Sequence, residues 1–62
     1  ELKLSVRELE IARMIADDLS DKEIAWRLGV EISTVRTYLK RIFAKLGVRR
    51  RGGVASLMAR GR

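Results

Sequence analysis

The sequence predicts an all-α fold, in which residues 1–62 form one domain of four short helices. Three observations lead to this prediction. Apolar residues recur at the three- and four-residue spacings of helices that bury one side. Two Ser-x-x-Glu sequences are typical of helix starts. Glycines follow two of the apolar stretches, where a left-handed residue commonly ends a helix. Because the chain is short, we expect a small core and marginal stability.

The first helix is expected to begin beside Val6. Ser5 and Glu8 form a capping box, in which each side chain accepts a hydrogen bond from the other residue's backbone amide. Asp17 and Asp18 disfavour continuation, because the helix dipole repels anions at a C-terminus. The predicted buried side consists of Leu9, Ala12, Ile15, Ala16 and Leu19, with Ile11 at its margin.

The second helix repeats this start, with Ser20 and Glu23 as another capping box. Gly29 suits a left-handed ending, and a link of about three residues leads to a third helix over Ile32–Leu46. Two helices joined by so short a glycine-containing link, the second of them basic, predict a helix-turn-helix. The predicted inward residues are Ile24, Ala25 and Leu28 in the second helix, and Ile32, Val35, Leu39, Ile42, Phe43 and Leu46 in the third.

The other side of the Ile32–Leu46 helix carries cations and hydroxyl groups but no acid. Its residues are Ser33, Arg36, Thr37, Lys40, Arg41 and Ala44. Such a face fits a helix that lies in the major groove of DNA, because short side chains between cations allow close approach to base edges. An ordinary solvated face has the same composition, so this helix alone leaves both interpretations open.

The last helix is expected to be unstable alone and to depend on packing against the core or against a second copy of itself. Three arginines, Arg49 to Arg51, stand at its positive end, which is unfavourable unless a phosphate lies there. Gly52 and Gly53 weaken its first turn, and Gly61 is expected to end it. Its apolar side includes Val54, Leu57 and Met58, which could dock on the core or on a second copy of the domain.

Charge is unevenly distributed along the chain. Residues up to Glu31 hold five cations and eight acids, whereas residues from Ile32 onward hold nine cations and no acid. This asymmetry favours a polyanionic partner, either nucleic acid or membrane headgroups. Membrane attachment is the weaker alternative, because the third helix uses its apolar side for a core.

Residue types that carry most chemistry are absent from the sequence. Cysteine and histidine are both missing, which excludes disulfides and removes the usual zinc ligands and the usual general base. No apolar run reaches the roughly 18 residues of a membrane span. We therefore expect no enzyme activity, no metal site and no cofactor.

Three motifs together resemble the LuxR/GerE-type helix-turn-helix domain, also called the NarL/FixJ type. They are LS-x-RELE over residues 4–10, SDKEIA over residues 20–25 and TVRTYLKRIFAKLGV over residues 34–48, and they match without a gap. The resemblance implies the four-helix C-terminal part of a cytoplasmic bacterial transcription regulator. It also implies a third helix in the major groove and a dimer contact through the fourth, for which Val54, Leu57 and Met58 are the expected residues. The chain begins at Glu1 rather than methionine, so we expect it to be a piece of something longer.

Residue by residue, the resemblance implies base contacts at Arg36, Thr37 and Lys40. Expected DNA backbone contacts are Ser20, Ser33, Thr34, Tyr38, Arg41, Lys45, Arg49 and Arg51. The sequence departs from the usual family pattern at four positions, namely Asp18 for glycine, Asp21 for asparagine, Glu31 for serine and Tyr38 for histidine.

The alternative of another class is a protein-interaction module, either sigma-like or an adaptor. Trp26 lies off the inward stripe of the second helix and could meet RNA polymerase or another domain of the parent chain. Its ring could equally lie over a neighbouring helix. Sequence-specific binding of double-stranded DNA as a homodimer is the leading prediction.

Overall fold

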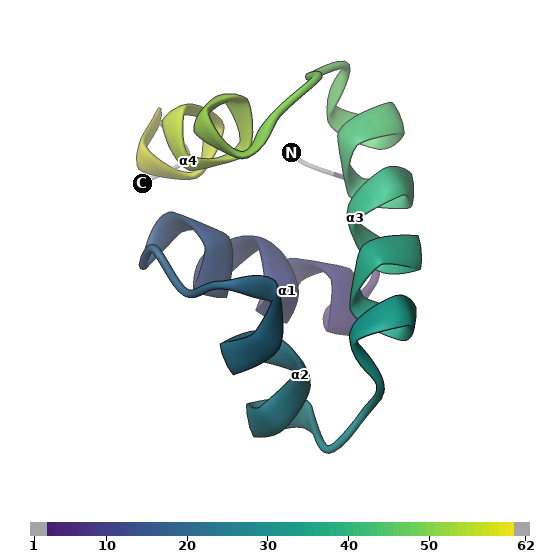
Figure 1. Cartoon of the computed structure of the whole chain (residues 1–62). Coiled ribbons are helices and arrows are strands. Elements are labelled where there is room, and N and C mark those ends of the chain that lie inside the picture. Colours follow the sequence, from purple (N-terminus) through teal and green to yellow (C-terminus); the bar gives the residue numbers. More distant parts are fainter. Residues whose placement is uncertain (1–2, 61–62) are drawn as a thin grey trace.

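The computed structural model describes residues 3–60, which form four helices and no strand. The helices are α1 (Val6–Ala16), α2 (Asp21–Leu28), α3 (Ile32–Leu46) and α4 (Arg51–Arg60). The predicted all-α class and the predicted span of the third helix are confirmed. In Figure 1, α3 stands along one edge of the molecule, with α1 and α2 on one side of it and α4 beside α1.

A single core joins the helices. α1 packs most extensively against α4 and also contacts α3, while α2 packs against α3. Every helix contributes to the core, whose members are Ile11, Ala12, Ile15, Ile24, Ala25, Val35, Leu39, Ile42 and Val54. The buried residue that is not apolar is Glu8, near the start of α1. α1 therefore joins α3 to α4, while α2 is held mainly by α3.

Local sequence explains where the helices begin. In α1, the Glu8 amide donates to Ser5 Oγ at 3.1 Å and the Ser5 amide donates to Glu8 Oε1 at 2.9 Å. In α2, Ser20 and Glu23 form the same pair of bonds at 3.1 and 2.8 Å. Both capping boxes are therefore confirmed. α3 begins after Glu31, whose side chain makes no capping bond.

The first three helices end in the same way. Gly29 and Gly47 follow α2 and α3 with φ of 69°, as predicted for left-handed caps. Asp18 takes the corresponding place after α1 with φ of 68°, and the Leu19 amide donates to the Met14 carbonyl at 3.0 Å. An aspartate therefore occupies a backbone conformation that glycine adopts more easily.

Two expectations about burial are corrected by the packing. Ile11 was expected at the margin of the buried side, yet it is fully buried, whereas Ala16 is exposed. Val54 is also fully buried inside the single chain, so its side chain is not available for contact with a second copy. The burial of Ile11 and of Val54 accompanies the packing of α4 against α1. The predicted helix end at Gly61 lies outside the described residues.

The two glycines at the start of α4 have different surroundings. A Cβ atom added at Gly53 would lie 2.8 Å from Val48 Cβ and 2.9 Å from Val48 Cγ1, whereas one added at Gly52 would meet nothing within 4 Å. Real side chains do not approach this closely. Gly53 therefore lets α4 pass close to Val48, while Gly52 serves no such contact.

Alanine substitutions should separate these two glycines. Gly52→Ala should raise the free energy of unfolding by about 0.5–1 kcal/mol, because alanine favours the helix and has room. Gly53→Ala should lower it by about 1 kcal/mol, since overpacking against Val48 outweighs the same gain. Urea unfolding followed by circular dichroism measures both. Equal stabilisation by the two substitutions would show that α4 can move away from Val48 at little cost.

Candidate nucleic-acid interface

The exposed side of α3 forms one continuous polar surface. Val35, Leu39 and Ile42 are buried in the core, so the opposite side of the helix must face outward. The exposed residues of α3 are Ser33, Thr34, Arg36, Thr37, Lys40, Arg41, Ala44 and Lys45. This set contains no acid, as the sequence predicted. We define Arg36, Thr37 and Lys40 as the α3 ridge.

The three residues of the α3 ridge differ in how far their polar groups are engaged within the domain. The Arg36 side chain is 69% exposed, with its Nε 3.8 Å from Asp21 Oδ2. Thr37 Oγ1 donates to the Ser33 carbonyl at 3.1 Å, so its hydroxyl can accept a further bond while its proton is engaged. Lys40 is exposed and makes no ion pair with residues 3–60.

Three of the expected backbone contacts have defined partners within the domain. The Arg41 guanidinium lies over the Tyr38 ring at 5.9 Å from its centroid, a cation–π contact that orients both side chains. Tyr38 is half-buried against the core. Ser20 is exposed at the start of α2, where its Oγ caps the Glu23 amide. A capping oxygen leaves the hydroxyl proton of Ser20 free to donate.

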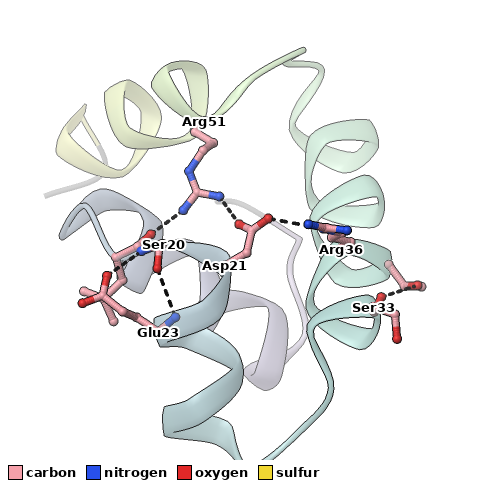
Figure 2. A network of polar contacts seen from close by, with 8 residues as sticks. Ser20, Asp21, Glu23, Ser33, Arg36 and Arg51 are labelled. Carbon is pink, nitrogen blue, oxygen red and sulfur yellow. Dashed lines mark hydrogen bonds and ion pairs between the residues drawn. The ribbon is translucent and has the colours of Figure 1, made fainter.

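Asp21 connects three helices. Its carboxylate receives a hydrogen bond from Arg51 Nη1 of α4, and Arg51 Nη2 donates to the Leu19 carbonyl. Arg36 of α3 approaches the other carboxylate oxygen (Figure 2). The Arg51 guanidinium is thus engaged within the domain, and its expected contact with a DNA phosphate stays a prediction.

Glu8 forms a second link between helices. Lys45 Nζ of α3 donates to Glu8 Oε1 at 2.7 Å, and Glu8 also accepts from the Ser5 amide. The Lys45 hydrogen bond, followed by the Ser5 bond, holds the pKa of Glu8 below its ordinary value of 4.5. Lys45 was expected at a DNA phosphate, but its amine is bound to α1 in this structure.

Sequence reasoning did not find these two links. Glu8 and Lys45 are 37 residues apart, and Asp21 and Arg51 are 30 apart. Glu8 was assigned to its capping box alone, which accounts for one of its two hydrogen-bond partners. Asp21 stood out as a departure from the family pattern, and this was the signal that marked it as unusual.

Other surface features bear on function. Trp26 is 83% exposed, so of the two alternatives for this residue the one in which its ring lies over a neighbouring helix is wrong. No helix among residues 3–60 has both the length and the apolar character needed to cross a membrane. That part of the chain also lacks any group of three or more acidic, histidine or cysteine side chains arranged to hold a metal.

The geometry defines a class of protein. A short glycine turn joins α2 to α3, and α3 buries one side while its cationic side faces outward, which is the arrangement of a helix-turn-helix DNA-binding domain of a transcription regulator. The chain belongs to the luxR family of bacterial regulatory proteins, whose family model matches residues 2–58.

Similar proteins are transcriptional regulators by name. The chain is 48% identical over 50 residues to a probable HTH-type transcriptional regulator, GfsR, of Streptomyces halstedii, covering 81% of this chain and 21% of that protein. It is 40% identical over 58 residues to the transcriptional regulatory protein TdiR of Thauera aromatica, covering 94% and 26%. It is 42% identical over 48 residues to the transcriptional regulatory protein DesR of Bacillus subtilis strain 168, covering 77% and 24%.

The matched region is a small part of each relative. The chain spans between 21% and 26% of the length of these three proteins. No solved structure matches the chain significantly.

The Glu8 link should make stability depend on pH. Because the pKa of Glu8 is lower in the folded protein than 4.5, its contribution is complete above that pH and is lost as pH falls through the lowered value. Glu8→Gln should therefore lower the free energy of unfolding at pH 7 and flatten its decline toward pH 3, as measured by urea unfolding.

Glu10→Gln is the matched control, since Glu10 lies on the same helix in an exposed pair with Arg7 at 3.8 Å. Exposed pairs contribute little to stability. In this variant the free energy of unfolding should therefore fall toward pH 3 as steeply as in wild type. An unchanged decline in Glu8→Gln would contradict the assignment of the pH dependence to Glu8.

Proposed function

We propose that the domain binds double-stranded DNA sequence-specifically by laying α3 in the major groove, with Arg36, Thr37 and Lys40 at base edges. The observation that supports this most is the α3 ridge, a cationic surface without acids on a helix whose other side is fixed in the core. Arginine and lysine suit the acceptors of guanine. The methyl group of Thr37 suits the methyl group of thymine.

Six further residues are proposed to contact the DNA backbone. They are Ser20, Ser33, Thr34, Tyr38, Arg41 and Arg49, of which all but the half-buried Tyr38 are exposed. Contacts of this kind set the register of α3 on the duplex, while base contacts set the sequence. Lys45 and Arg51, the other two expected backbone contacts, are engaged by Glu8 and Asp21 within the domain.

A dimer is the proposed working form. One domain of this size offers a small DNA interface, and two copies on half-sites about 10 base pairs apart would double it. Leu57 and Met58 of α4 are half-buried in the single chain and remain the candidates for contact with a second copy. The parent protein would be a bacterial regulator that acts on DNA in the cytoplasm.

Binding to duplex DNA should fall steeply with salt, because bound cations release counterions from the phosphates. Lys40→Ala should weaken binding to a duplex selected for tight binding by about 1–3 kcal/mol and should weaken binding to random duplex less. Fluorescence anisotropy over a salt series measures both.

Arg13→Ala is the matched control, because Arg13 is an exposed cation of α1, the helix against the buried side of α3. It should change neither affinity more than about twofold. Equal losses on selected and random DNA from Lys40→Ala would exclude Lys40 as a base contact. A wild-type domain that binds no duplex at low salt would exclude the proposed function.

A second candidate role is supported by Trp26. This residue is 83% exposed on α2, and a large exposed aromatic side chain is typical of protein contact sites. RNA polymerase or another domain of the parent chain is the proposed partner. This role is compatible with DNA binding, because Trp26 does not belong to α3.

Trp26→Ala should leave the affinity for random duplex unchanged and should weaken capture of purified bacterial RNA polymerase by the DNA-bound protein. An exposed aromatic contact residue costs about 2 kcal/mol or more when truncated at an interface centre. The exposed Val6→Ala serves as control. If RNA polymerase binds wild type and Trp26→Ala equally, Trp26 is not its contact.

A further inference from the structure

Two arginines from different helices share the Asp21 carboxylate. Arg51 of α4 donates to Oδ1, and Arg36 of α3 lies with Nε 3.8 Å from Oδ2 (Figure 2). Arg51 is also anchored on the Leu19 carbonyl, and its side chain is 38% exposed. The Asp21 side chain is 28% exposed. Asp21 and Arg51 therefore form an anchored pair, against which the more exposed Arg36 rests.

The contact with Arg36 differs from the contact with Arg51. At 3.8 Å it is longer than a hydrogen bond, and exposed ion pairs of this kind are weak. A phosphate or a guanine can therefore displace the carboxylate. The contact uses Nε, and residues 3–60 offer Arg36 no other ion pair. The terminal nitrogens of its guanidinium consequently remain open to an incoming acceptor.

We propose that Asp21 is a positioning residue for DNA binding: its carboxylate, fixed by Arg51, holds Arg36 beside α2 in the free domain and lowers the affinity for DNA of random sequence. This inference rests on the proposed function of α3. On random DNA, Asp21 competes with a single phosphate for Arg36. At a matching site, acceptors on the base edges outcompete the carboxylate, so the domain discriminates better than an unrestrained arginine would allow.

A double-mutant cycle on a short random-sequence duplex tests this role. Asp21→Asn should raise affinity about fivefold at about 0.15 M salt and steepen the salt dependence by about one phosphate contact, since each contact contributes a slope of about 0.9. In the Arg36→Ala background the same substitution should have no effect. An equal rise in both backgrounds would overturn the proposal, because Asp21 would then act only by repelling phosphate through space.

Two further variants complete the test. Asp21→Glu keeps the charge and should restore the low affinity of wild type for random DNA, while Asp17→Asn should not change it. Asp17 is an exposed acid at the end of α1 that makes no ion pair with the described part of the chain. If the effect of Asp21→Asn disappears in Arg51→Ala but persists in Arg36→Ala, the held residue is Arg51 and the proposal is wrong.

A measurement without DNA separates this proposal from the proposed function. In the free protein, Asp21→Asn should shift the Arg36 Nε–Hε resonance in nitrogen-15 spectra more than that of Arg41, which lies over Tyr38. An unmoved Arg36 resonance would overturn the positioning role, even in a protein that binds DNA. A domain that binds no duplex but shows the shift would overturn the proposed function and leave the contact established.

Discussion

Burial of one side of α3 is the constraint on which the other features depend. Val35, Leu39 and Ile42 of this helix lie in a core to which every helix contributes. The described residues form one core cluster, and α3 turns its apolar side toward it. That orientation turns Arg36, Thr37 and Lys40 outward together. The candidate interface is therefore a consequence of packing, and any change that rotates α3 moves all three residues.

Two carboxylates form links between helices: Glu8 joins α1 to α3, and Asp21 joins α2 to α4. Glu8 belongs to the capping box of α1 and also binds Lys45 near the end of α3. Asp21 stands at the start of α2 and binds Arg51 of α4. In both places, an acid that favours a helix N-terminus also neutralises a cation from a helix distant in the sequence. The Lys45 amine and the Arg51 guanidinium are thereby held in defined positions, and part of the repulsion among the cations of the second half is neutralised.

The uneven charge of the chain acquires a structural meaning in this arrangement. The acids of the first half are not merely remote from the cations of the second, because Glu8 and Asp21 reach into the cationic half and engage three of its members. The α3 ridge nevertheless keeps Lys40 without an ion pair among residues 3–60. The cations of the second half therefore range from Lys45 and Arg51, which are hydrogen-bonded to acids, to Lys40, which is not.

Local signals allowed the sequence to predict much of the fold. The two Ser-x-x-Glu boxes determined the starts of α1 and α2, and Gly29 and Gly47 determined the ends of α2 and α3. These features depend on residues within one turn of each other, so spacing alone reveals them. The face of α3 that points outward also followed from helical periodicity.

Tertiary structure alone decided how the helices meet. Full burial of Ile11 and Val54 follows from the packing of α4 on α1, and the close approach of Gly53 to Val48 follows from the path into α4. The partners of Lys45 and Arg51 are 37 and 30 residues away. Periodicity specifies which side of a helix is apolar, but not which neighbour covers it or which charge lies across the contact. Those features depend on distances between segments, which exist only once the core has formed.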